Sequence, residues 1–312
     1  MRKILVLICA VLSLEIAAAE LMPEALRESD NPIISICASR DNANLALVIK
    51  DDNEYSLKLL KFSGDKINSE RLISKCKKIS CVEFFGNDEI YYIHDDNNLS
   101  VYNIKNSSAK KLSDAAKFVL SPDLEKILFM HKGALWIKTL SGDKESAKVI
   151  QRKGASPNVW LGNNEFIFSC DGSLFKSTLQ GRSEILVKGE SYSPWFVEAA
   201  LSPDGKNILA FSDDTKANVG AASRSLWLFN MKKKELRQFF SASFALWLND
   251  NEILVLKNGT LLKLNINGGT SETLYKGNVE SFTVSGGKIY FSESTVDDIG
   301  LYENSCLKMI RL

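Results

Sequence analysis

One sequence motif recurs seven times along this chain, and the repetition restricts the possible folds more than any other feature. The clearest copy reads LSPDGKNILAFSDD at 201–214 and continues as SLWLFN at 225–230. A second copy reads LSPDLEKILFMHKG at 120–133 and continues as ALWIKTL. The other five copies are weaker, with turn elements near residues 39, 85, 161, 248 and 285. The repeats are about 41 residues apart, a spacing typical of β-propellers.

Each repeat holds four short segments rich in Val, Ile, Phe, Tyr and Trp, separated by turn residues. In the fifth repeat these segments lie near 196–201, 207–212, 225–230 and 235–240. Such strands leave no room for intervening helices, so they pair as a four-stranded antiparallel sheet. One sheet has two apolar faces and cannot cover both alone, whereas sheets stacked in a ring cover each other. The sequence predicts an all-β, seven-bladed propeller, with six blades as the alternative.

The turn before the second strand has a local mechanism in the fifth repeat. Pro203 fixes φ for the first turn position, Asp204 can accept backbone hydrogen bonds, and Gly205 adopts positive φ without steric cost. We therefore interpret Asp204, and Asp123 at the same position of the third repeat, as turn residues rather than catalytic ones.

The first nineteen residues have the pattern of a signal peptide. Arg2 and Lys3 precede an apolar run from Ile4 to Leu14, and Ala17-Ala18-Ala19 forms a small-residue cleavage site. We predict a leader at 1–19, an N-terminal segment at 20–31 and the propeller at 32–312, with localisation in the periplasm or outside the cell. No strand is evidently left to close the ring by exchange between its ends, so we expect residues 20–31 to plug the channel or to extend as a tail.

The charge of the mature chain excludes some partners. Without the leader, the 39 basic residues lose Arg2 and Lys3 and the 38 acidic residues lose Glu15, which leaves a formal charge of zero. A neutral chain has no basic surface typical of nucleic-acid binding. No further segment approaches the roughly 20 apolar residues of a transmembrane helix. We predict no nucleic-acid partner and no membrane span in the mature chain.

The LSPDGKNILAFS element and the LWLFN that follows it resemble the repeat of TolB-like periplasmic β-propellers. The fifth repeat carries the best match and the third a good one. The resemblance implies a periplasmic scaffold that offers one end of its channel to other envelope proteins. TolB has an α/β domain before a six-bladed propeller, so here the resemblance covers the propeller alone.

Motifs for catalysis are scarce. The chain has two histidines, His94 and His131, and no phosphate-binding glycine loop, nucleophile elbow or zinc-protease motif. We predict no catalytic residue, no cofactor and no metal. We expect a scaffold that binds an envelope protein or peptide segment. The alternatives are a carbohydrate-binding or polysaccharide-lyase-type propeller and a purely structural subunit with a broad apolar outer surface.

Two groups of residues remain as candidates. Cys76 and Cys81 are the closest pair of cysteines and are candidates for a local disulfide in an exported protein, with small core residues as the alternative. The loops around the fifth repeat combine aromatic and charged side chains, which are typical of binding hot spots. The predicted partner-binding residues are Tyr192, Trp195, Asp213, Asp214 and Arg224.

Overall fold

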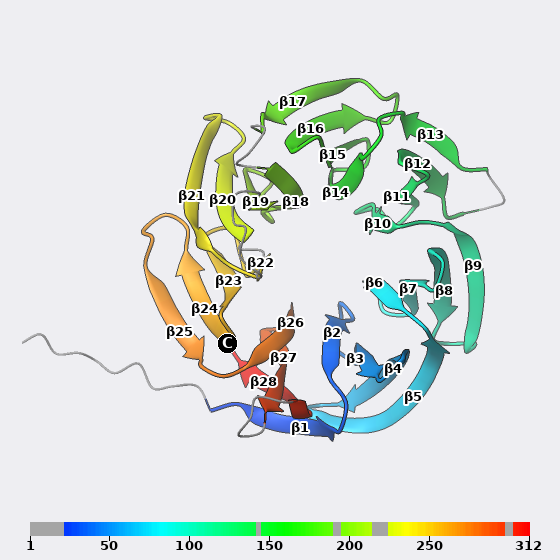
Figure 1. Ribbon diagram of the computed structural model, residues 1–312, viewed down its shortest axis with the longest axis vertical. Coiled ribbons are helices and arrows are strands. Elements are labelled where there is room, and N and C mark those ends of the chain that lie inside the picture. The colour runs from blue at the N-terminus through cyan, green and yellow to red at the C-terminus, as the bar shows by residue number, and fades with distance from the viewer. Residues whose placement is uncertain (1–21, 142–144, 190–194, 214–223, 297–301) are drawn as a thin grey trace, which may run out of the picture.

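A computed structural model shows seven four-stranded antiparallel sheets arranged as the blades of a ring (Figure 1). The structure describes residues 22–141, 145–189, 195–213, 224–296 and 302–312. The prediction of an all-β propeller is confirmed, with seven blades rather than six. The described residues form no helix that is long and apolar enough to cross a membrane.

Blades 1 to 6 each take four consecutive strands, and the first strand of each lies nearest the centre of the ring (Figure 1). Blade 1 contains β2 (Ile33–Ala38), β3 (Asn44–Asp51), β4 (Glu54–Ser63) and β5 (Lys66–Cys76). Blade 2 contains β6 (Ile79–Phe85), β7 (Glu89–His94), β8 (Asn98–Asn103) and β9 (Ser108–Asp114). Blade 3 contains β10 (Lys117–Leu120), β11 (Lys126–His131), β12 (Ala134–Thr139) and β13 (Ala147–Ile150). Blade 4 contains β14 (Ser156–Leu161), β15 (Glu165–Cys170), β16 (Ser173–Thr178) and β17 (Ser183–Val187). Blade 5 contains β18 (Trp195–Leu201), β19 (Asn207–Asp213), β20 (Arg224–Asn230) and β21 (Glu235–Ser241). Blade 6 contains β22 (Phe244–Trp247), β23 (Glu252–Lys257), β24 (Thr260–Asn265) and β25 (Ser271–Tyr275).

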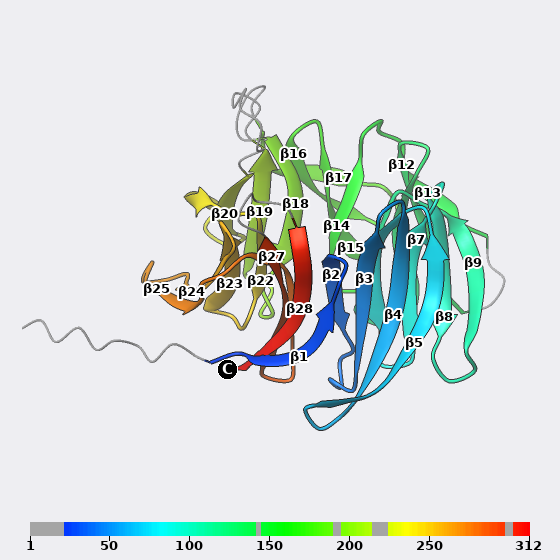
Figure 2. The ribbon, with the colours of Figure 1, turned by 60° about the horizontal axis from the view of Figure 1, so that its bottom comes forward.

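The seventh blade closes the ring with strands from both ends of the chain. It contains β26 (Val279–Ser285), β27 (Lys288–Val296), β28 (Tyr302–Arg311) and, outermost, β1 (Glu24–Ser29). Strand β1 runs antiparallel to β28, with Glu24 opposite Met309 and Ser29 opposite Ser305 (Figure 2). The expectations that no strand is left to close the ring by exchange between its ends, and that residues 20–31 plug the channel or form a tail, are therefore wrong. The edge of β28 offers backbone hydrogen bonds, and β1 satisfies them.

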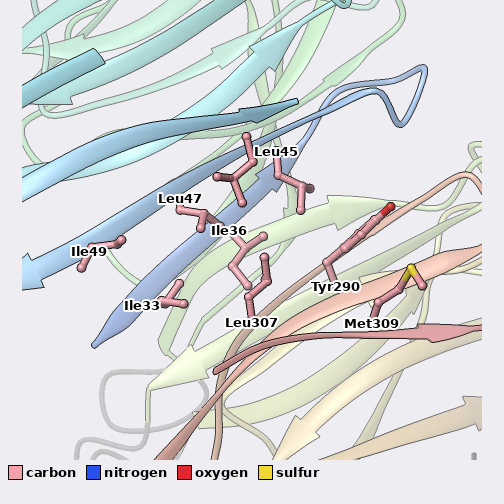
Figure 3. Close-up of a cluster of buried hydrophobic side chains, with 9 residues drawn as sticks. Ile33, Ile36, Leu45, Leu47, Ile49, Tyr290, Leu307 and Met309 are labelled. Atoms are coloured by element: carbon pink, nitrogen blue, oxygen red, sulfur yellow. The ribbon is translucent and has the colours of Figure 1, made fainter. Parts of the chain in front are cut away.

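The core of the molecule lies between the blades. Seven clusters of buried apolar side chains occupy the seven junctions between neighbouring blades. At the junction of blades 7 and 1, Leu45 and Leu47 of β3 face Tyr290 of β27 and Leu307 of β28 (Figure 3). Both faces of the second strands are buried, so β3 reads as a continuous apolar run. This packing confirms that each blade covers its neighbours.

The two faces of the ring differ in their connections. The turn face carries the tight turns between the first and second strands of each blade and, in blades 1, 2, 4, 5 and 6, those between the third and fourth strands. The loop face carries the opposite ends of the strands, with the described turns between second and third strands and the described passages from one blade to the next. In blade 5 the turn face holds 202–206, and the loop face holds the ends of β19 and β20 at Asp213 and Arg224.

The turn face is stabilised by a repeated hydrogen-bond pattern. In blade 5 the Ser202 hydroxyl donates to Asp204 Oδ1 at 2.7 Å and accepts from the Asn207 N–H at 2.9 Å. Asp204 Oδ1 also accepts from the Lys206 N–H at 3.0 Å. The same contacts link Ser121, Asp123 and Lys126 in blade 3 and Ser39, Asp41 and Asn44 in blade 1. These bonds support the interpretation of Asp204 and Asp123 as turn residues.

Candidate functional site

A cavity of about 400 Å³ lies on the loop face where blades 3, 4 and 5 meet the central channel. Its walls come from the first residues of β10, β14 and β18, from the β15–β16 turn and from the facing ends of β19 and β20. The lining residues are Lys117, Gly154, Ser156, Ser169, Cys170, Asp171, Gly172, Trp195, Phe196, Val197, Glu198, Asp213 and Arg224. A cavity of this size is within the range of small-ligand sites.

Trp195 forms the apolar wall of this cavity. Its indole lies against Gly172, where a Cβ atom would come within 2.7 Å of the ring. Gly172 has φ of +69°, and its carbonyl oxygen accepts the Phe196 N–H at 2.9 Å. Glycine is therefore required at 172 both by the backbone conformation and by the indole.

Arg224 forms one polar wall. Residues Asp213 and Arg224 are opposite each other across the β19–β20 pair. The Arg224 Nε lies 3.3 Å from Asp213 Oδ1, and its NH1 group lies 3.2 Å from Glu198 Oε2. The guanidinium is thus held between two carboxylates and stays one-third exposed to the cavity.

Lys117 forms the second cationic wall. Its ammonium donates to Asn158 Oδ1 at 3.3 Å, and no carboxylate of the described residues lies within ion-pair distance of it. Burial lowers the pKa of Lys117, although the nearby charge of Glu198 acts in the opposite direction. An incoming anion would compensate the partly buried charge.

Glu83 lies on the inner strand β6, close enough to Lys117 to sense its charge. Burial raises the pKa of the Glu83 carboxyl from 4.5 to about 7, and the positive charge of Lys117 offsets part of this rise. A carboxyl that titrates near neutral pH can give or take a proton under physiological conditions.

Irregular strand pairing accompanies these side chains on the channel wall. A register shift interrupts the pairing of five inner strands near their loop-face end: β2, β6, β14, β18 and β26. The extra residue is Cys81 in β6 and Asn158 in β14. A bulge redirects the side chains around it, so these strands present polar groups to the channel within otherwise apolar sequences.

The structure brings together three of the five predicted partner-binding residues. Trp195, Asp213 and Arg224 line the same cavity, whereas Tyr192 and Asp214 lie outside the described residues. Sequence reasoning missed Lys117, Glu198 and Glu83. The sequence feature that could have identified them is a single charged residue in the innermost strand of a repeat, where the other repeats have mostly apolar or small side chains.

The disulfide predicted between Cys76 and Cys81 is not formed. All five cysteines of the described region are free thiols. Cys76 ends the outer strand of blade 1, and its thiol faces the carbonyl oxygen of Lys78. Cys81 is the bulged residue of the inner strand of blade 2, with φ of +52°. Between these two residues the chain passes from the outer strand of blade 1 to the inner strand of blade 2, so the two thiols lie in different environments.

Known proteins resemble this chain in structure rather than in sequence. No family model and no curated protein matches the sequence. An oligogalacturonate lyase in complex with manganese superposes with a TM-score of 0.65 at 13% identity, covering 94% of this chain and 96% of that one. An oligogalacturonate lyase from Vibrio parahaemolyticus gives 0.64 at 11% identity, covering 93% and 94%. TolB from Acinetobacter baumannii gives 0.56 at 13% identity, covering 75% of this chain and 63% of its own.

The fold is that of a TolB-like propeller. The resemblance noted in the repeats is thereby confirmed at the level of fold. At 11–13% identity, the comparisons establish the architecture and leave the function to be argued from the site.

Proposed function

We propose that this protein is an exported binding scaffold whose cavity at the channel mouth receives a segment of a partner protein of the cell envelope. The leader-like residues 1–19 motivate the export. The observation that carries the binding role is that Lys117 and Trp195 line the same cavity.

The chemistry of the cavity defines the segment that it would bind. Arg224 is already neutralised by Asp213 and Glu198, whereas Lys117 has only the Asn158 amide oxygen. A carboxylate on the partner, from an acidic side chain or a chain end, would pair with Lys117. An apolar side chain next to it would cover the indole of Trp195. Aromatic and cationic anchors of this kind dominate the binding energy of interfaces.

The test begins with capture of partners from the envelope fraction and continues with synthetic peptides of the captured protein. We expect Trp195→Ala and Lys117→Met each to weaken peptide binding by about 30-fold, a hot-spot effect of about 2 kcal/mol. Isothermal titration measures the affinity. Lys206→Ala is the matched control, because this exposed lysine lies on the turn face. Equal binding by all three variants would disprove the cavity as the docking site.

An acidic oligosaccharide is a second candidate ligand, favoured by Glu83. Two cations line the cavity, and Glu83, which is not a lining residue but senses the charge of Lys117, has a pKa near 7 and could accept a proton. Solved structures that share the fold include oligogalacturonate lyases. Incubation with oligogalacturonate would then yield an unsaturated uronic acid, detected by ultraviolet absorbance, and Glu83→Gln would abolish it. No product at high protein concentration would eliminate lyase activity, and no heat of binding in a titration with oligogalacturonate would eliminate it as a ligand.

A further inference from the structure

A second cavity, of about 490 Å³, opens on the loop face between blades 1 and 2. It lies where β5 ends and where β7 turns into β8. The lining residues are Glu54, Lys75, Cys76, Lys77, Lys78, Asp95 and Asp96. This cavity shares no lining residue with the one at the channel mouth.

Three potential metal ligands gather at its edge. One donor atom each of Cys76, His94 and Asp95 lies within 4.8 Å of the other two. The outer strand of blade 1 delivers Cys76, and the second strand of blade 2 delivers His94 and Asp95. The passage between the blades joins them, because the Asp95 N–H donates to the Lys78 carbonyl oxygen at 2.9 Å. A thiol, an imidazole and a carboxylate are ligands that zinc accepts.

Neighbouring groups orient two of the three ligands. His94 Nε2 lies 3.0 Å from the Ser100 hydroxyl, which leaves Nδ1 directed at Asp95 Oδ2, 3.4 Å away. Asp95 Oδ1 accepts the Lys77 N–H at 2.9 Å, which leaves Oδ2 for another partner. Outer contacts of this kind fix imidazole and carboxylate ligands in metal sites.

The charges around the cluster are mixed, with Glu54, Asp95 and Asp96 lining the cavity together with Lys75, Lys77 and Lys78. Lys75 is already paired with Glu54 at 2.7 Å. Cys76 is a free, half-buried thiol that can bind metal as a thiolate. His94 is half-buried, and its ring packs against Tyr92 with 5.3 Å between the ring centres.

We propose that Cys76, His94 and Asp95 bind a zinc ion whose fourth coordination position faces the second cavity. Three protein ligands with one open position are typical of zinc sites that bind a further ligand. The sequence alone predicted no metal, because the cysteine and histidine come from different blades and have no zinc-motif spacing. The site is independent of the partner-binding proposal.

Metal titration of the purified protein, first stripped with a chelator, tests this site. We expect one zinc ion per chain by calorimetry. With cobalt(II) as the probe, we expect the ultraviolet charge-transfer band of a cobalt–thiolate bond and the intense visible bands of tetrahedral coordination. Cys76→Ser and His94→Gln should each weaken zinc binding by at least about 100-fold, and Ser100→Ala by about 10-fold. Cys76→Ser should also abolish the charge-transfer band.

Matched variants separate a specific site from general thiol binding. Cys81→Ser and His131→Gln remove the neighbouring thiol and the other histidine, and both should bind zinc like the parent. Thermal unfolding of the metal-free variants shows whether each one folds. As a second readout on the parent protein, zinc should slow alkylation of Cys76 and leave Cys81 reactive. Absence of stoichiometric binding, or an undiminished thiolate band in Cys76→Ser, would overturn the proposal.

Discussion

Carboxyl groups on the turn face and in the channel have opposite environments. Hydrogen bonds from Ser121 and neighbouring donors hold the pKa of Asp123 at about 2, and bonds from Lys206 and Ser202 do the same for Asp204. Burial instead raises the pKa of Glu83 to about 7. Donors around a carboxylate stabilise the folded ring, whereas a carboxyl that lacks them costs stability and stays available for binding or proton transfer. The turn face maintains the fold, and the loop face carries the reactive groups.

The largest effect that we expect from this contrast is the pH dependence caused by Glu83. Between pH 4.5 and about 7 the folded protein keeps a proton that the unfolded chain has lost. The free energy of unfolding therefore falls as the pH rises through this window, by at most about 3 kcal/mol. The side chain of Glu83 is half-buried rather than fully buried, which reduces this cost. In Glu83→Gln, the free energy of unfolding measured with urea should no longer fall across this pH window.

A second variant makes the assignment to Glu83 specific. The positive charge of Lys117 lowers the pKa of Glu83, so Lys117→Met should extend the fall in stability to higher pH. The same pH dependence in the parent protein and in Glu83→Gln would show that another group is responsible.

The next effect concerns the hydroxyl that organises the turn of blade 5. Ser202 is 2% exposed, and Ser202→Ala leaves the Asn207 N–H without its acceptor. We expect the free energy of unfolding to fall by about 1–2 kcal/mol, while peptide affinity at the channel mouth stays unchanged. Denaturant unfolding and titration on the same sample measure both. Weaker peptide binding by this variant would contradict the division of roles between the faces.

A smaller loss is expected from backbone conformation alone. Gly205 has φ of +72°, and a Cβ added there would meet no atom within 4 Å. Gly205→Ala should therefore lower the free energy of unfolding by about 1 kcal/mol through strain rather than through a clash. Thermal unfolding measures the change, with Gly64 as a second test position of positive φ and open space. A neutral result at both positions would show that the turns tolerate side chains.

The smallest effect belongs to the charge of Asp123. Its pKa is lowered from 3.8 to about 2, so its contribution to stability is complete above pH 3.8 and is lost as the pH falls toward 2. Asp123→Asn should be less stable than the parent at neutral pH, and the difference should vanish at acid pH. Circular dichroism measures the stability of both proteins across the acid range. A stability difference that stays constant with pH would assign the effect to altered turn geometry instead.

Local interactions made the turn face and the blades predictable. The strands of blade 5 begin and end within one residue of the predicted ranges. Ser202, Asp204 and Asn207 interact within a few residues of one another, so their order in the sequence determines their contacts.

Contacts between distant segments were not predictable in the same way. Strand β1 reads EALRES, which has no β-branched or aromatic residue, and each of its residues is exposed or only partly buried. Trp195 and Arg224 were found because they stand beside long loops. Lys117 and Glu83 were missed because one charged residue in an inner strand leaves no periodic signal. Cys76 and His94 meet only through the passage between two blades.

The pairing of β1 with β28 also determines when the ring can close. The paired residues are separated by about 280 residues in the sequence, so closure joins two segments that lie far apart along the chain. Bringing these segments together costs more loop-closure entropy than pairing strands that a short turn connects. Until this pairing forms, the outer edge of β28 is uncovered, and unpaired strand edges are surfaces on which aggregation begins. Loss of the β1–β28 pairing would therefore leave this edge open to a strand of another molecule.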